Sequence, residues 1–290
     1  MQRLVFIFFL LVCFNFKPLS QGPIDGFMKG EGNLDGAIGF SVQRSDLYYG
    51  LDDEIYDLNY SAELLSFFAQ YGLSDKFDAV ATVPFIFTQF ENKFQDMGLF
   101  LKYRPVHYVF EKNHELDLLL SGGFTFPASD YRPDVTGAVG QRAQQIPLRG
   151  ILQLKTKNGI FFNTTGTFNY RLDKLSDNTI SLATSLNPNF ILVEPANSGL
   201  LMFRMGFATK KHFVEIFSEW QKTFGGVNFQ PTVYQPPQSY GVDYWKIGGT
   251  YYYDVVTNGL AINLSYIPRG RNIGNIISVS ISFILKYRQE

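Results

Sequence analysis

The stretch Ile276–Tyr287 reads I-I-S-V-S-I-S-F-I-L-K-Y, and it is the most informative part of the chain. Apolar and polar residues alternate along it, with Ile284 as the exception. A period of two is the pattern of a strand with one apolar and one polar face. Its length, about twelve residues, is roughly what a tilted strand needs to cross a bilayer. The pattern predicts a membrane-spanning strand whose lipid-facing residues are Ile277, Val279, Ile281, Phe283, Leu285 and Tyr287.

The same alternation recurs along the chain. Segments rich in turn-forming residues divide it into about twelve strand candidates. In Ile160–Leu172, for example, Phe162, Phe168 and Tyr170 alternate with polar residues. The candidates before the terminal one are Gly36–Tyr49, Ile55–Tyr71, Phe77–Phe87, Met97–Arg104, Leu116–Phe126, Leu148–Lys155, Ile160–Leu172, Gly199–Thr209, Phe213–Phe224, Tyr244–Val255 and Leu260–Ile267.

Short and long connections alternate between these segments. The long ones are Pro127–Pro147, Asp173–Ser198 and Gly225–Asp243. Membrane barrels have short periplasmic turns and long outer loops. The sequence therefore predicts an all-β, antiparallel up-and-down membrane barrel of about twelve strands, with both termini in the periplasm. The short connections are Gly72–Lys76, Pro105–Asn113, Thr156–Gly159, Lys210–His212 and Thr257–Gly259.

The N-terminus has the pattern of an export signal. A basic start at Arg3 precedes the apolar run Leu4–Phe16, and Lys17-Pro18-Leu19-Ser20 breaks that run. A transmembrane helix needs about 20 apolar residues, so the run is too short for a permanent anchor. We expect a Sec signal peptide over residues 1–20, cleaved near Ser20, and a barrel domain over residues 21–290. Because Cys13 is the only cysteine, the mature chain has no thiol chemistry.

The composition narrows the location and the partners. A net charge of −1 argues against a nucleic-acid partner. Aromatic residues make up 17% of the chain, a surplus that interfacial girdles of a membrane barrel would use. Trp220 and Trp245 are expected to face outward as interfacial anchors. Tyr234, Tyr240 and Tyr244 either belong to the girdle or stack on an aromatic solute. The expected location is the bacterial outer membrane, with outer-membrane lipid as a partner.

A charged inner face follows from the alternation. One interpretation is a polar conduit whose charge rings tune permeation of a small-molecule solute. The other is a network of self-paired charges that fills a narrow barrel, since about eight strands leave no open channel and 16 to 18 leave an aqueous one. The expected lumen-lining residues are Glu63, Lys102, Arg104, Asp117, Arg149, Lys155, Arg171, Arg204, Glu215, Glu219, Lys246 and Asp254.

Short motifs along the chain carry a resemblance to a known family. They are Met28-Lys29-Gly30-Glu31-Gly32-Asn33, Tyr71–Asp78 into Val83-Pro84-Phe85, Asp96–Arg104, Gly123–Pro127 and Gly270–Gly274. In these, the chain resembles the bacterial outer-membrane barrels of the phenol-degradation meta-pathway or "transporter" family, particularly its Bacteroidetes versions. The resemblance implies an outer-membrane channel that takes up small hydrophobic or aromatic compounds.

The C-terminal residues are relevant to how the barrel is assembled in the membrane. A barrel of this kind is expected to meet the barrel-assembly machinery during its biogenesis. Arg288-Gln289-Glu290 follow Tyr287, so the chain departs from the usual aromatic ending of an outer-membrane barrel.

A catalytic barrel is a rival interpretation. A barrel hydrolase such as a phospholipase needs a nucleophile or activated water beside a histidine. His107, His114 and His212 are all expected in or beside short periplasmic turns, and the expected mature chain has no Gly-x-Ser-x-Gly elbow. We expect no enzyme activity, no catalytic residues, no cofactor and no metal. We therefore expect a passive channel for small, possibly hydrophobic or aromatic, solutes, and the alternative is a structural or surface-interaction barrel without conductance.

Overall fold

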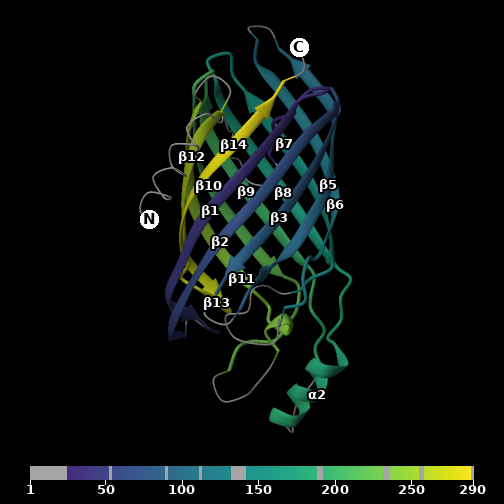
Figure 1. Cartoon of the computed structure of the whole chain (residues 1–290), viewed down its shortest axis with the longest axis vertical. Helices are drawn as coiled ribbons and strands as arrows, with labels where there is room; N and C mark the ends of the chain where they lie inside the picture. The colour runs from purple at the N-terminus through teal and green to yellow at the C-terminus, as the bar shows by residue number, and fades with distance from the viewer. Residues whose placement is uncertain are drawn as a thin grey trace, which may run out of the picture.

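The computed structural model describes residues 25–51, 54–88, 91–110, 113–131, 142–187, 192–230, 236–254 and 258–288. Over these residues the chain forms one antiparallel barrel of twelve long strands (Figure 1). The long strands are β1 (Leu34–Tyr49), β2 (Ile55–Ser74), β3 (Phe77–Phe87), β5 (Asp96–Val109), β6 (Glu115–Pro127), β7 (Gln145–Lys155), β8 (Ile160–Arg171), β9 (Ser198–Ala208), β10 (His212–Thr223), β11 (Asp243–Asp254), β12 (Asn258–Arg271) and β14 (Ile277–Tyr287).

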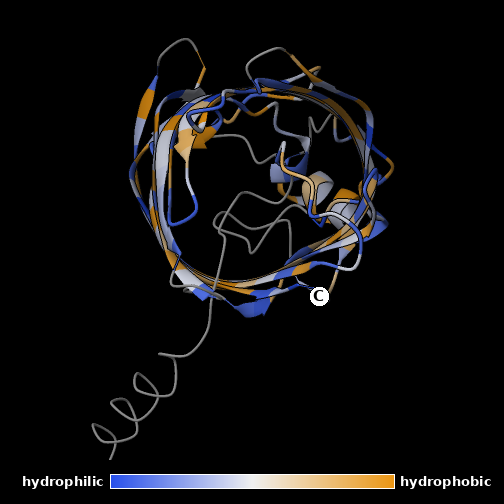
Figure 2. Cartoon of the chain, turned by 90° about the horizontal axis from the view of Figure 1, so that it is seen from above, coloured by the Kyte–Doolittle hydropathy of each residue, from blue (hydrophilic) through white to orange (hydrophobic). Residues whose placement is uncertain are grey.

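The strands pair in chain order, and β1 closes the barrel. Ile38 of β1 pairs with Phe67 of β2 on one side and with Phe283 of β14 on the other. Seen along its axis, the barrel is a closed ring (Figure 2). Closure leaves no long strand with an unpaired edge. The predicted all-β, up-and-down barrel of twelve strands is confirmed.

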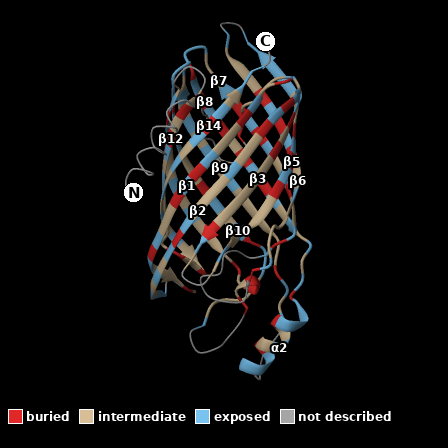
Figure 3. Ribbon diagram, in the orientation of Figure 1, coloured by how far each residue is buried: buried red, intermediate tan, exposed pale blue. Residues whose placement is uncertain are grey.

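Side-chain alternation explains why these segments are strands of a membrane barrel. Along β14, Ile277, Val279 and Ile281 are 49%, 49% and 41% exposed on the outer surface. Ile284, the exception in the pattern, is buried inside the barrel. Buried and exposed residues alternate along the other strands too (Figure 3). Apolar side chains on an outer face require lipid, so the alternation fits a barrel set in a bilayer.

The two ends of the barrel differ in their connections. The end where β1 begins and β14 finishes has short turns, and we call it the turn end. There Thr156 N donates to Ile160 O (2.7 Å), and Gly159 has a φ of 89°, which glycine adopts readily. The opposite end, which we call the loop end, holds the connections over 128–144, 172–197 and 224–242. This sorting was predicted from the sequence.

The structure extends several predicted elements. Strand β5 continues through Pro105 to Val109 because the register shifts between Tyr103 and Val106, which leaves the proline at a bulge. The loop-end connection after β8 contains a helix that the alternation did not predict, α2 (Asp177–Leu186). Short pieces β4 (Asn92–Phe94), β13 (Ile273–Gly274) and the 3-10 turn η2 (Pro237–Ser239) complete the loop end. Among the described residues, no helix has the length and apolar character needed to span a membrane.

Candidate functional site: the barrel interior

Residues 25–33, which precede β1, fold back into the barrel at its turn end. We call them the plug segment. Gly32 N donates to Gly72 O and Gly72 N donates to Asn33 O, both at 2.9 Å, so the segment is tied to β2. Gly30 and Gly32 have φ values of 77° and 73° and form the turn that leads into β1. The sequence analysis did not predict this segment, because it has no strand alternation.

Buried polar side chains of the barrel wall bind the plug segment and hold it in place. Lys102 of β5 is fully buried; its Nζ donates to Phe27 O (2.6 Å) and lies 3.4 Å from Asp25 Oδ1 and 3.6 Å from Asp78 Oδ2. Gln70 Nε2 donates to Asp78 Oδ2 (2.6 Å) and to Phe27 O (3.2 Å). Lys102 was predicted to line the lumen; its ammonium group points inward and contacts both the plug segment and Asp78 of the wall.

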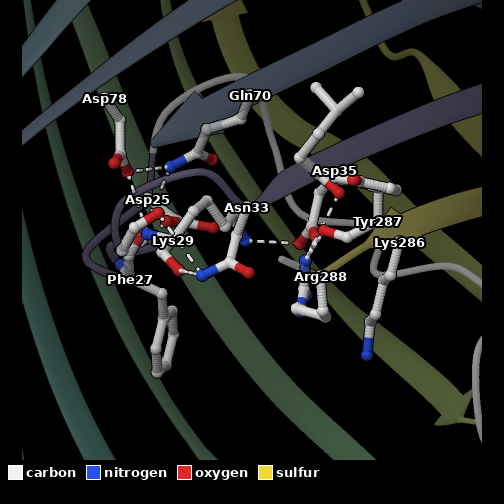
Figure 4. A network of polar contacts seen from close by, with 12 residues as sticks. Asp25, Phe27, Lys29, Asn33, Asp35, Gln70, Asp78, Lys286, Tyr287 and Arg288 are labelled. Carbon is white, nitrogen blue, oxygen red and sulfur yellow. Dashed lines mark hydrogen bonds and ion pairs between the residues drawn. The ribbon is translucent and has the colours of Figure 1, made fainter. Parts of the chain in front are cut away.

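A second group of contacts joins the plug segment to the start of β1 and to the residue that follows β14. Lys29 Nζ lies 2.8 Å from Asp35 Oδ2, and Asp78 Oδ2 accepts from Lys29 N (3.1 Å). Arg288 Nη1 lies 2.6 Å from Asp35 Oδ1, so a residue after β14 pairs with one on β1 (Figure 4). Asp35 is therefore shared between the plug segment and the strand pair that closes the barrel.

Apolar contacts also join the plug segment to the inner face of the barrel. The Phe27 ring meets the edges of Phe161 on β8 and Phe213 on β10, with centroids 5.4 and 6.1 Å apart. Met28 packs against a buried cluster of Val80, Phe100, Leu119 and Ile151, which comes from β3, β5, β6 and β7. The inner face is thus partly apolar at the depth of the plug segment. The sequence analysis assigned only polar residues to this face, because inward aromatic side chains look the same in sequence as girdle residues.

A cavity of about 640 Å³ lies inside the barrel. Hydroxyl side chains from the closing strands line one wall, including Ser41 of β1 and Ser278, Ser280 and Ser282 of β14. Ser41 Oγ and Ser278 Oγ are 3.0 Å apart. The serines of β14, which mark the polar face of this strand in the sequence, therefore face the cavity.

Charged side chains of both signs line this cavity from β9, β10 and β11. Glu219 accepts from Tyr244 Oη (2.8 Å) and pairs with Lys246 Nζ (2.5 Å). Glu215 accepts from Thr250 Oγ1 (3.1 Å), and Arg204 lies in the same lining. Because Tyr244 points inward to Glu219, it does not belong to the outer girdle. The predicted residues Arg204, Glu215, Glu219 and Lys246 are thus brought together.

The remaining inward charges lie outside this cluster. Arg149 sits over the Phe100 ring, with its guanidinium carbon 5.0 Å from the centroid. Pairs near the turn end are Arg104 with Asp117 (3.6 Å), Lys155 with Glu115 (3.3 Å) and Lys286 with Asp254 (2.5 Å). At the loop end, Arg171 pairs with Asp173 (2.6 Å).

Glu63 was predicted to face the lumen, and the structure places it on the outer surface. Along the loop-end half of β2 the usual polarity is reversed, since Asp57, Asn59, Ser61 and Glu63 are exposed on the outside. The intervening side chains point inward, where Ala62 packs with Ile86 and Tyr131, and Tyr60 and Leu64 pack against that cluster. The alternation was read correctly, but its faces were assigned by polarity alone. The outward polar run fits a strand end that extends past the apolar belt.

Connections at the loop end are held together by specific contacts. Asn272, with a φ of 55°, donates through Nδ2 to Gly241 O (2.9 Å) and accepts from Phe229 N (2.9 Å). Tyr131 Oη donates to Asp96 and accepts from Arg142 N (2.6 Å). Burial, together with the Asp96 carboxylate, raises the pKa of the Tyr131 phenol, so this hydroxyl stays protonated. Described parts of two long connections therefore pack at this end; Tyr234 falls outside the described residues.

The histidines lie near the turn end, as expected. His107 Nδ1 is 2.7 Å from Asp117 Oδ1 on β6, and His212 Nδ1 is 3.1 Å from Tyr251 Oη. His114 lies in the turn where Phe110 N donates to its carbonyl (2.8 Å). Within the described residues, no three His, Cys, Asp or Glu side chains are grouped to hold a metal ion.

The fold is similar to those of solved outer-membrane channels. The chain superposes on the COG4313 outer membrane channel from Pseudomonas putida F1 with a TM-score of 0.67 and 12% identity, covering 93% of this chain and 100% of the channel. It superposes on the NanC porin with a TM-score of 0.53 and 8% identity, covering 88% and 100%. No family model and no curated protein matches the sequence. These likenesses establish a barrel fold shared with outer-membrane channels.

Proposed function

We propose that this protein is a passive outer-membrane channel for small solutes, with the turn end in the periplasm and the loop end outside the cell. The observation that carries the proposal is the cavity of about 640 Å³, which polar and apolar side chains line together, inside a barrel with an apolar outer surface. Ligand cavities of roughly 300–1,000 Å³ hold small molecules, so this volume fits a single small solute. The likeness to solved channels supports the same function.

The plug segment sets the resting state in this proposal. It crosses the barrel between β5 and β8, and its contacts use Lys102, Gln70 and Asp35. No covalent bond has to break for the segment to leave, because these contacts are hydrogen bonds, ion pairs and ring contacts. The segment therefore acts as a gate on the periplasmic side, and transport through the opened barrel is passive.

The side chains that line the cavity also indicate which kind of solute it binds. Serine, threonine and asparagine side chains and the charges of Arg204, Glu215, Glu219 and Lys246 line part of the cavity, and apolar side chains such as Phe68 and Met202 line the rest. Such groups bind polar or charged solutes, by hydrogen bonds to each polar group that loses water. We propose small polar solutes as the main cargo. The family resemblance implies aromatic compounds, and a small aromatic acid would satisfy both lines of argument.

Proteoliposome swelling tests the proposal. Vesicles that contain the wild-type barrel are compared with vesicles that contain a variant lacking residues 25–32, using sugars, amino acids and aromatic acids of increasing size. We expect the variant to admit small solutes faster than wild type and to exclude large ones. If neither protein admits any solute while heat-modifiable gel mobility shows both to be folded, a structural barrel without transport replaces the channel.

A further inference from the structure

Two arginine side chains inside the barrel, Arg149 of β7 and Arg204 of β9, form no ion pair with any carboxylate of the described residues. Lys102 and Lys246, which also point inward, each have such a partner. Nη1 of Arg149 is buried and has no hydrogen-bond partner in the described part of the chain. The Arg204 guanidinium donates only to the Met202 sulfur, from Nε at 2.9 Å. Buried donors are nearly always satisfied, so these two groups require an explanation.

Both arginines belong to the same region of the barrel interior. Arg204 lines the cavity of about 640 Å³. The Arg149 guanidinium is repelled by that of Arg204 and attracted by Glu219, a second side chain of the cavity lining. Arg149 therefore lies beside the cavity, and its charge acts on whatever the cavity holds.

Buried hydroxyl groups flank Arg149 on the neighbouring strands. Ser121 of β6 and Thr167 of β8 are its direct strand partners. Directly paired residues point to the same face of a sheet, so both hydroxyls face inward with the guanidinium. Their side chains are only 6% and 8% exposed, and Ser121 Oγ has no hydrogen-bond partner among the described residues. Ser121 and Arg149 thus provide unsatisfied donors on adjacent strands.

The charges around the cavity leave one positive charge without a counterpart. Glu219 pairs with Lys246 at 2.5 Å, and Glu215 attracts Arg204. Arg149 is the cation that remains after these two carboxylates are assigned. A buried charge without compensation is unfavourable, so this position favours an anion that carries one negative charge.

We propose that Arg149 and Arg204, together with the hydroxyl groups beside Arg149, bind a solute that carries a single carboxylate. A guanidinium group binds a carboxylate through two parallel, charge-assisted hydrogen bonds. The body of the solute lies against the apolar part of the cavity lining, which includes Phe68 and Met202. The proposal rests on the proposed channel function and names the class of solute that the channel carries, small monocarboxylates with an apolar body.

Binding of para-fluorobenzoate to the purified barrel in detergent tests the site without any transport step. The fluorine NMR signal of this probe shifts and broadens on binding, which makes weak affinities measurable. We expect saturable binding at neutral pH, where the probe is ionised. Its neutral analogue of nearly the same shape, para-fluorobenzamide, should bind about tenfold more weakly, because charge-assisted hydrogen bonds are the stronger ones.

Substitutions of single arginines test the assignment of the site. Arg149→Met and Arg204→Met each remove one guanidinium group and should weaken binding of para-fluorobenzoate by about tenfold. Arg204→Lys keeps the charge but loses the planar pair of donors, so it should bind with intermediate affinity. Arg104→Met is the matched control, because Arg104 pairs with Asp117 (3.6 Å) near the turn end and does not line the cavity. Heat-modifiable mobility confirms that each variant is folded.

Three results would overturn the proposal. Equal affinity of the wild type for the benzoate and the benzamide would show that the cavity recognises only the apolar ring. Unchanged affinity in both arginine-to-methionine variants would place the carboxylate elsewhere. Tighter binding of a fluorinated phthalate, which has two carboxylates, would contradict the single unbalanced charge. Swelling of proteoliposomes with neutral sugars separates this failure from failure of the proposed function, since sugar entry without carboxylate binding retains the channel and removes this site.

Discussion

Lys102 is the residue on which the plug segment depends most. It is buried, and its ammonium group serves Phe27 O, Asp25 and Asp78 together. Removing one partner of a buried ion pair costs about 3–5 kcal/mol, because the other charge is left without compensation. The contacts with Asp25 and Phe27 O are lost from the closed state alone, since both leave with the segment, whereas Asp78 stays in the wall and loses its partner in both states. A hundredfold shift in population needs only about 2.8 kcal/mol.

Lys102→Met is therefore expected to release the plug segment by about a hundredfold or more, while the barrel stays folded. Limited proteolysis of the reconstituted protein measures the release as faster cleavage within residues 25–33. Lys155→Met is the control, because Lys155 pairs with Glu115 at 3.3 Å in a half-exposed position. Equal protection in wild type and in Lys102→Met would show that this lysine does not hold the segment.

Gly72 is the second residue on which the plug segment rests. A Cβ there would lie 1.8 Å from Gly30 O, so no side chain fits while the turn stays docked. We expect Gly72→Ala to displace the segment and to speed its proteolysis. Gly150→Ala, which meets nothing within 4 Å, should leave cleavage unchanged. Unchanged cleavage in Gly72→Ala would mean that the backbone bonds to Gly72 do not dock the segment.

At the scale of elements, the strands were predictable and the segments between them were not. Each of the twelve predicted strands exists, because a period of two persists wherever one face meets lipid. Strand ends moved where local features prolonged pairing, as at Pro105 in β5. Helix α2 and the plug segment were missed because neither carries that period. In the structure, Ser176 caps α2 by accepting from Thr179 N (3.2 Å).

The sequence predicted which side chains point into the barrel, but it did not predict which of them pair with each other. Eleven of the twelve predicted charges lie inward or at the inner rim, whereas Glu63 lies on the outer surface because β2 reverses its polarity near the loop end. The pairing of Lys102 with the plug segment and of Arg288 with Asp35 joins residues far apart in the chain. Period analysis reports which face a residue occupies and contains no information on such pairs.

The assignment of Glu219 to the inner face and Glu63 to the outer face predicts different effects on ion selectivity. In a variant lacking residues 25–32, Glu219→Gln leaves Lys246 without its carboxylate partner, which now lies at 2.5 Å. The lumen becomes more positive, so the reversal potential in a salt gradient should shift toward anions. Glu63→Gln changes a charge on the outer surface and should leave the reversal potential unchanged. A shift of the same size in both variants would contradict the assignment of faces.

At the scale of the whole molecule, the closing strand pair and the plug segment share one carboxylate. Asp35 joins Lys29 of the segment to Arg288 beyond β14, so the contacts that hold the plug segment meet those that close the barrel (Figure 4). Because β1 and β14 also pair through eleven residues of ladder, the barrel has ample backbone bonding without the segment. The segment can leave while the barrel stays closed.

The central claim is that the plug segment occludes a lumen that is otherwise open. Single-channel conductance in planar bilayers tests it most directly, with the wild-type barrel compared with the variant lacking residues 25–32. The account predicts rare, brief openings in wild type and a steady conductance in the variant. Silence from the variant, with heat-modifiable mobility showing that it is folded, would contradict the account. A steady conductance of equal size in both proteins would contradict it as well.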